Sequence, residues 1–205
     1  MNNVICLGLN HRTAGVEVRE RFAVADAALA DVARRFQAIE GIEETVILST
    51  CNRVEFYAAG PGLVSGYRAL ERFLLDHSGV RPGELGVLYR YDFPHSVRHL
   101  FGVVCGLDSM VVGETEIHGQ VKAAYEEAVR HGLTSRVLNR LFQRAFRVAK
   151  QVRTRTSINR GSVSVGSVAA DLAQRIFGSL AGCRALVLGA GETGERTARS
   201  LMARG

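Results

Sequence analysis

The sequence contains little cysteine, and its cysteines are scattered. Four occur among 205 residues, at positions 6, 51, 105 and 183, and no two of them form a C-x-x-C pair or another metal-ligand spacing. This pattern argues against a disulfide scaffold and against a zinc centre, so we predict no metal site. It also favours a reducing compartment.

Long apolar runs are missing as well. The longest uncharged stretch, residues 56–67, is short and is interrupted by Pro61 and three glycines, whereas a membrane span needs about 18 consecutive apolar residues. No basic region precedes the short apolar stretch Val4–Leu9, so we predict no signal peptide. We expect a cytoplasmic protein that does not bind a membrane.

Acidic residues are absent from one long segment. Between Ala128 and Ala170 there is no Asp or Glu, and this segment alone makes the chain basic, with a formal net charge of +6. Such a patch suits a polyanion. A solvated helix face, or a helix that pairs with acidic residues elsewhere in the protein, would give the same pattern.

The remaining composition is that of a folded protein. Hydrophobic residues make up 47% of the chain and charged residues 22%, which excludes disordered, collagen-like and low-complexity chains. A chain of this length can bury a hydrophobic core without disulfide or metal cross-links. It would form one large domain or two small ones.

The N-terminal part is predicted to mix strands and helices, and it ends where the prolines end, at Pro94. Its order is β-α-β-β-α-β, the ferredoxin-like arrangement, so the fold class is α/β. Asp26 is a candidate N-cap for the first helix. The predicted strands are 3–9, 44–50, 53–59 and 86–91, and the predicted helices are 26–39 and 63–77.

After Pro94 the chain is predicted to be helical. Glycines and a polar loop separate helices at 95–105, at 116–130, from about 134 into the 150s, and at 161–177. The third of these has an apolar stripe with most of the arginines outside it. The stripe consists of Val137, Leu138, Leu141, Phe142, Ala145, Phe146, Ala149 and Val152.

The last segment has the pattern of a dinucleotide-binding loop. An apolar strand at 183–188 is expected to lead into G-x-G-x-x-G at Gly189, Gly191 and Gly194 and then into a helix. One parallel strand and one helix cannot bury their faces alone. We therefore expect the segment to open a truncated Rossmann domain whose remainder is absent.

Cys51 is the candidate nucleophile. It lies in Ser49-Thr-Cys-Asn-Arg53, in a tight turn between two predicted strands, with a cation two residues away that would favour the thiolate. The same features fit a structural cysteine. Cys6 and Cys105 lie in apolar runs and are expected in the core. His99, on a predicted helix, could face the cysteine or the core.

Six segments of the chain carry motifs of one known family, in the same order. They are Gly8–Ala14, Ser49–Arg53, Gly106–Glu114, Gly119–Lys122, Ala149–Thr156 and Gly189–Gly194. Through them the chain resembles glutamyl-tRNA reductases over essentially its whole length. One departure is Gly113-Glu-Thr-Glu-Ile-His-Gly-Gln120, where Glu116 replaces the family's usual glutamine and adds a negative charge.

The resemblance implies an NADPH-dependent enzyme that reduces glutamyl-tRNA(Glu) to glutamate-1-semialdehyde, the first step of tetrapyrrole (porphyrin, 5-aminolevulinate) synthesis. It makes Cys51 the nucleophile that forms a thioester, and His99 an acid/base or orienting group. Arg53 would bind the carboxylate of the glutamyl side chain. The implied substrate contacts are Thr50, Asn52, Arg53, Ser109, Glu114, Thr115, Glu116 and Gln120. The implied NADPH loop is Gly189, Ala190, Gly191, Glu192, Thr193 and Gly194.

The resemblance also implies a domain organisation. Residues 1–156 would form the catalytic domain, and 157–205 a linking helix with the start of the NADPH domain. Family members form homodimers through a C-terminal domain that is absent here, and glutamate-1-semialdehyde aminomutase is a further candidate partner. The alternative is a non-catalytic module, derived from the same family, that binds tRNA or a protein partner.

Overall fold

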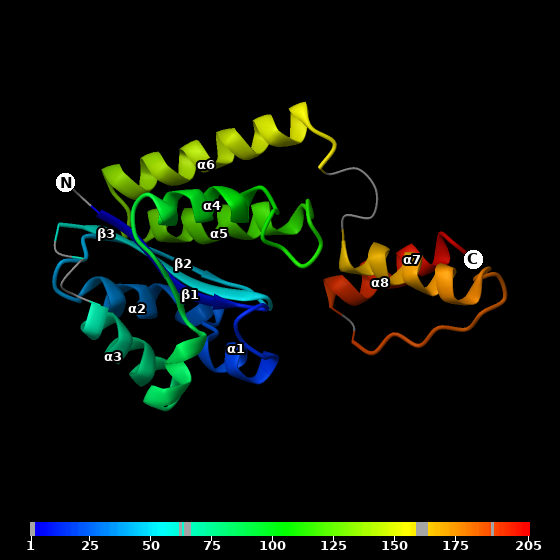
Figure 1. Cartoon of the computed structure of the whole chain (residues 1–205), viewed down its shortest axis with the longest axis horizontal. Coiled ribbons are helices and arrows are strands. Elements are labelled where there is room, and N and C mark those ends of the chain that lie inside the picture. The colour runs from blue at the N-terminus through cyan, green and yellow to red at the C-terminus, as the bar shows by residue number, and fades with distance from the viewer. Residues whose placement is uncertain (1–2, 62, 64–66, 159–163, 190) are drawn as a thin grey trace.

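The computed structural model describes residues 3–61, 63, 67–158, 164–189 and 191–205. It has a four-stranded antiparallel sheet with helices on both faces, and a separate pair of helices at the C-terminal end (Figure 1). Among the described residues, no helix has the length and apolar character needed to cross a lipid bilayer.

The sheet has the strand order β2-β3-β1-β4, and every neighbouring pair is antiparallel. The strands are β1 (Asn3–Asn10), β2 (Glu44–Ser49), β3 (Arg53–Gly60) and β4 (Tyr89–Tyr91). The predicted β-α-β-β-α-β order is present, with one additional helix, α1 (Val16–Phe22), that the sequence analysis missed. This connectivity puts the β2–β3 turn, which carries Cys51, at one end of the sheet.

Helices cover both faces of the sheet. One face is covered by α1, α2 (Asp26–Gln37) and α3 (Tyr67–Ser78), and the other by α4, α5 and α6 (Figure 1). In β3, Phe56 packs on Phe36 of α2, with ring centroids 5.1 Å apart, while Tyr57 meets Phe142 of α6 at 5.5 Å. Successive side chains of β3 therefore point to opposite faces of the sheet. Helices cover both faces, so every residue of the strand is buried.

The three helices on the second face of the sheet confirm the helices predicted from apolar periodicity between Pro94 and the 150s. They are α4 (His95–Val104), α5 (Glu116–Arg130) and α6 (Arg136–Arg155). Their buried side chains form one core with the sheet, because the apolar stripe of α6 turns inward. Glu44 of β2 caps the start of α6, and its carboxylate accepts the N–H groups of Ser135, Val137 and Leu138 at 2.8, 2.9 and 2.8 Å.

Two predictions in the N-terminal part are wrong. Asp26 is the first residue of α2, and the cap position belongs to Ala25, whose backbone is still extended. The predicted strand 86–91 is a strand only at Tyr89–Tyr91, because Pro82–Val87 forms the 3-10 helix η1. Pro82 suits the first turn of η1, since that position needs no N–H donor.

The C-terminal helices α7 (Val165–Phe177) and α8 (Glu192–Met202) pack against each other. At their crossing, a Cβ on Gly166 would lie 2.7 Å from the Thr197 hydroxyl oxygen. The strand predicted at 183–188 is not formed, since no strand among the described residues offers it backbone partners. Leu186 and Leu188 are consequently 85% and 88% exposed. Residues 64–66 and 161–163 of the predicted helices lie outside the described residues.

Candidate active site

Cys51 is exposed on a turn that hydrogen bonds hold in place. The Thr50 hydroxyl accepts the N–H of Arg53 at 3.1 Å, and the Thr50 N–H donates to the Arg53 carbonyl at 2.8 Å. The Arg19 side chain, from α1, donates to the Cys51 carbonyl at 3.1 Å, and the His11 N–H donates to the Asn52 carbonyl at 2.9 Å. The backbone is thus fixed on both sides while the thiol remains accessible.

A pocket opens beside this turn and gathers most of the predicted substrate contacts. Its walls come from the β2–β3 turn, the loop after α4, the first turns of α5 and the start of α7. Among the predicted contacts, only Thr115 does not line it. The lining residues are Thr50, Cys51, Asn52, Arg53, Ser109, Met110, Val111, Glu114, Glu116, Ile117, Gln120, Ser164 and Val165.

The guanidinium of Arg53 points inward and already has partners. It is 1% exposed, donates to a Glu55 carboxylate oxygen at 2.7 Å, and donates to the Asp108 carbonyl and carboxylate at 2.7 and 3.2 Å. Arg12 and Asn10 also contact the Asp108 carboxylate, at 3.0 and 3.2 Å. The cation expected to favour the Cys51 thiolate is therefore balanced by two carboxylates.

Glu55 is the centre of this buried network. Its oxygens also accept hydrogen bonds from Tyr57 at 2.6 Å and Tyr89 at 2.5 Å, and one lies 2.9 Å from a ring nitrogen of His99. Burial by itself would raise the pKa of Glu55, but the hydrogen bond from His99 and the charge of Arg53 outweigh it and lower the pKa to about 2. Glu55 is therefore a buried anion at neutral pH.

His99 faces this network rather than the cysteine pocket. Its ring, on α4, lies against Tyr91 and Tyr89, with centroids 4.7 and 5.2 Å away. Cys6 joins the same cluster. Cys6, Glu55 and His99 each offer one atom that could bind a metal ion, and these three atoms lie within 4.8 Å of one another. Burial, followed by the charge of Glu55, raises the pKa of Cys6 well above its usual value. A raised pKa disfavours the thiolate, which is the form in which cysteine attacks a carbonyl or binds a metal.

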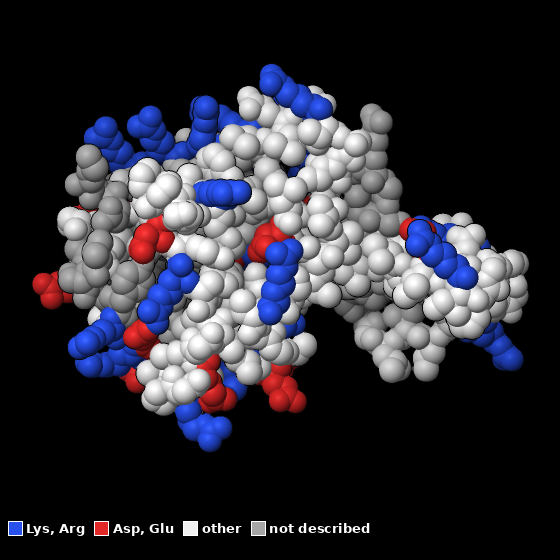
Figure 2. All heavy atoms as spheres, in the orientation of Figure 1, with Lys and Arg blue, Asp and Glu red and all other residues white. Residues whose placement is uncertain are grey.

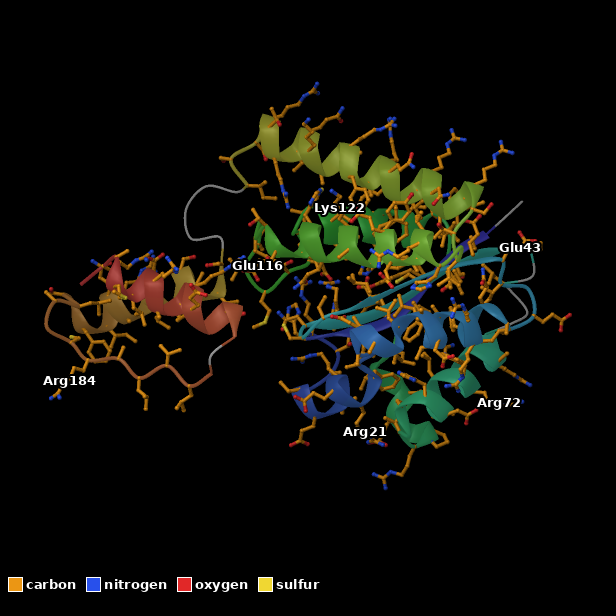
Figure 3. The ribbon with its side chains drawn as sticks, turned by 180° about the vertical axis from the view of Figure 1, so that it is seen from behind. Arg21, Glu43, Arg72, Glu116, Lys122 and Arg184 are labelled. Carbon is orange, nitrogen blue, oxygen red and sulfur yellow. The ribbon has the colours of Figure 1, made fainter. Side chains whose placement is uncertain are left out.

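The loop between α4 and α5 forms one wall of the pocket. Glu114 caps α5, since its carboxylate accepts the Glu116 N–H at 2.9 Å, and the Ser109 hydroxyl donates to the same carboxylate at 3.0 Å. The Glu116 side chain extends toward the C-terminal helices (Figure 3) and pairs with Arg196 of α8 at 2.5 Å. Gln120 remains exposed at the pocket edge.

The glycine loop lies outside the cysteine pocket. Gly189 has φ +115, and a Cβ on Gly194 would approach the Gly189 carbonyl oxygen to 2.6 Å, so the loop packs as closely as the motif requires. Gly191 precedes the first residue of α8, so the backbone N–H groups of that helix start next to the loop. Thr193 is exposed. Ala190 and the Glu192 side chain lie outside the described residues.

Sequence reasoning missed four residues of the site. Glu55 carried a usable signal, because it is the one acidic residue in a strand that is otherwise uncharged after Arg53. Arg19, Tyr89 and Asp108 carried none, because their roles depend on contacts between segments far apart in the chain. The expected placement of Cys6 and Cys105 in the core is confirmed.

Comparisons with known proteins identify the family to which this chain belongs. Residues 7–156 match the family described as "Glutamyl-tRNAGlu reductase, N-terminal domain". A glutamyl-tRNA reductase from Akkermansia muciniphila is 47% identical over 205 residues, which cover 98% of this chain and 59% of that protein. One from Pelotomaculum thermopropionicum is 46% identical and is matched over 46% of its length.

A solved structure gives the same result. The glutamyl-tRNA reductase from Methanopyrus kandleri superposes with a TM-score of 0.67 at 39% identity, over 98% of this chain and 47% of that one. The chain thus spans about half the length of most of the relatives it matches. A family match over most of the chain, together with this shared fold, shows that the chain belongs to the glutamyl-tRNA reductase family.

Proposed function

We propose that this chain performs the acyl-transfer half of an NADPH-dependent glutamyl-tRNA reductase. The observation that supports this most strongly is the exposed Cys51, held on a fixed turn in a pocket lined by the predicted substrate contacts. The product of the complete reaction would be glutamate-1-semialdehyde, the starting compound of tetrapyrrole synthesis in this family.

The first step is attack of the Cys51 thiolate on the ester carbonyl that joins glutamate to the tRNA. The C–S bond forms, the bond to the ribose oxygen breaks, and that oxygen takes a proton as the tRNA leaves. Glutamate then remains on Cys51 as a thioester. A thioester accepts hydride more readily than an oxygen ester, and a thiolate leaves readily, so a cysteine suits this position.

The pocket offers groups of both charges for the glutamyl moiety. Glu114 and Glu116 suit its ammonium group, and Ser109, Asn52 and Gln120 provide neutral hydrogen-bond partners. The side-chain carboxylate would compete with Asp108 for the Nη2 group of Arg53. In this proposal Asp108 occupies, in the free protein, the position that the substrate carboxylate takes on binding.

His99 acts through Glu55 and not on the substrate. Its ring nitrogen lies 2.9 Å from the Glu55 carboxylate, which in turn binds Arg53 at 2.7 Å. His99 thus orients Glu55, and Glu55 fixes the guanidinium at the pocket wall. We therefore propose His99 as a positioning residue.

The C-terminal segment fits an NADPH phosphate loop. Gly189, Gly191 and Gly194, with the backbone N–H groups at the start of α8, would hold the pyrophosphate. Bound NADPH supplies the hydride that reduces the acyl group on Cys51. We propose residues 1–156 as the catalytic domain and 157–205 as the link to the NADPH domain. Homodimerisation and contact with glutamate-1-semialdehyde aminomutase remain proposals for the whole protein.

The experiment is incubation of the 205-residue chain with NADPH and glutamyl-tRNA that carries label in its glutamate. We expect labelled protein and no semialdehyde, because the chain has only the loop and one helix of the hydride-donor domain. Transfer of label to Cys51→Ser would exclude Cys51 as the nucleophile. Semialdehyde formation would contradict the proposal that this chain carries out acyl transfer but not hydride transfer. Filter binding of tRNA without any covalent adduct would favour a non-catalytic module.

A further inference from the structure

One strongly charged surface is not used by the site described above. It lies on the outer side of α6 and consists of Arg136, Arg140, Arg144, Arg147 and Lys150, which we call the α6 cation row. All five side chains are exposed. Figure 2 shows Lys and Arg atoms along the edge of the molecule that α6 forms, and Figure 3 shows side chains with nitrogen tips projecting from this helix.

The row has no internal partner among the residues that the structure describes. Within the part of the chain that the structure describes, none of its five side chains makes a hydrogen bond or an ion pair, whereas elsewhere many arginines do, such as Arg12, Arg53 and Arg196. The sequence explains this, because no Asp or Glu lies between Ala128 and Ala170. Each helical turn therefore adds a cation without a neighbouring anion to balance it.

The row is also regular. At about 100° per residue its five members fall within an arc of roughly 120°, and at about 1.5 Å per residue they extend over roughly 21 Å of helix. The apolar stripe on the opposite side of α6, which includes Leu138, Phe142 and Ala145, anchors the helix in the core. The cations are thus spaced along one side of a rigid helix, which suits a ligand with charges repeated along its length.

The surface beside the row is hollowed on both sides, and one of the hollows borders α5, the helix that also borders the cysteine pocket. Four of the arginines line a groove with Phe93 and Phe101. On the other side, Arg147 and Lys150 border a second hollow with His118 and Lys122 of α5. Figure 3 shows Lys122 and Glu116 on this same helix, whose first turns line the Cys51 pocket. A long ligand can therefore contact the row while its end enters the pocket.

We propose that the α6 cation row binds the phosphate backbone of the tRNA whose aminoacylated end reaches Cys51. This rests on the proposed function for the identity of the RNA. Arginine suits such contacts because its planar guanidinium donates in pairs to phosphate oxygens. The contacts fix register without reading sequence, so the row contributes affinity and orientation rather than discrimination between tRNAs.

The test is filter binding of tRNA(Glu) that carries no amino acid, measured at several salt concentrations. We expect the double variant Arg140→Gln/Arg144→Gln to bind about tenfold more weakly and with a shallower salt dependence, since each lost phosphate contact removes about 0.7–0.9 from the slope of log affinity against log salt. The matched control is Arg68→Gln/Arg72→Gln. It removes the same charge from exposed positions of α3, on the other face of the sheet (Figure 3).

Three outcomes would overturn the inference. The first is equal binding by the wild type and the α6 variant, and the second is an equal loss in both double variants. The third is loss of binding to phosphatidylglycerol vesicles in the α6 variant with tRNA binding unchanged, which would assign the row to a membrane surface. Binding of tRNA restored by Arg140→Lys/Arg144→Lys would support the charge argument. Because tRNA without an amino acid undergoes no reaction at Cys51, these results are independent of the acyl-transfer test.

Discussion

Glu55 keeps a negative charge in the protein interior because donors surround both of its carboxylate oxygens. Arg53 supplies the balancing positive charge, and Tyr57, Tyr89 and His99 complete the coordination of the carboxylate. A buried pair of this kind contributes little beyond what an apolar pair would, but removal of one partner leaves the other charge unpaired. The site therefore depends on a residue that does not line the pocket.

We predict that Glu55→Gln lowers the free energy of unfolding by about 3 kcal/mol at neutral pH, because Arg53 would lose its fully buried counter-charge and keep only the partly exposed Asp108. Chemical denaturation of both proteins measures this. The control is Glu43→Gln, an exposed residue immediately before β2 (Figure 3), for which we expect a change below about 0.5 kcal/mol. A cost for Glu55→Gln as small as that of the control would contradict the account.

The stabilisation by Glu55 should depend on pH in a defined direction. The pKa of Glu55 is lowered in the folded protein from its ordinary value of 4.5 to about 2. A carboxyl group with a depressed pKa stabilises the fold fully above its ordinary pKa, and this contribution is lost as the pH falls toward the lowered value. The difference in unfolding free energy between wild type and Glu55→Gln should therefore shrink between about pH 4.5 and pH 2.

At the scale of elements, α6 begins where it does because of a residue in another part of the chain. Glu44 of β2 accepts three N–H groups at the start of α6, and its carboxylate lies at the positive end of the helix dipole. This contact joins the sheet to the helix that carries the α6 cation row.

We predict that Glu44→Gln costs about 1–2 kcal/mol of stability, because an amide oxygen replaces a charged acceptor and its NH₂ group faces the same donors. Thermal unfolding of the variant, with Glu43→Gln as the matched control, measures this cost. An unchanged melting temperature would contradict this prediction, because water would then replace the lost hydrogen bonds at no cost in free energy.

Local signals predicted the long helices well but failed for one short helix and for one strand near the C-terminus. Apolar periodicity gave α5 at residues 116–130, since its buried face includes Ile117, Val121 and Ala124. It missed α1, which is seven residues long and has only Arg19 and Phe22 buried. The strand expected at 183–188 failed because a strand needs neighbours as well as an apolar sequence.

The candidate site divided in the same way. The exposed turn with Cys51, and the convergence of Ser109, Glu114 and Gln120 on it, agree with the motifs. The inward orientation of Arg53 could not be predicted, because it depends on Asp108, 55 residues away, and on burial against Glu55. Whether His99 faces cysteine or core was likewise decided by tertiary contacts alone.

At the scale of the whole molecule, the cysteine pocket joins the two parts of the chain. Ser164 and Val165, at the start of α7, line the pocket together with the β2–β3 turn. Glu116, on the first turn of α5, pairs with Arg196 of α8. The segment that carries the glycine loop therefore begins at the wall of the cysteine pocket. This arrangement suits a reaction whose second step brings a nucleotide cofactor to an acyl group on Cys51.

The most direct test of the central claim is to locate the acyl group after the chain is mixed with glutamyl-tRNA. Mass spectrometry of the digested protein should find a glutamyl thioester on the peptide that contains Cys51, removable by hydroxylamine and absent from Cys51→Ser. The matched control is Cys183→Ser, which removes the other exposed cysteine and should leave the adduct unchanged. An adduct on Cys183, or tRNA binding with no adduct on Cys51, would contradict the account.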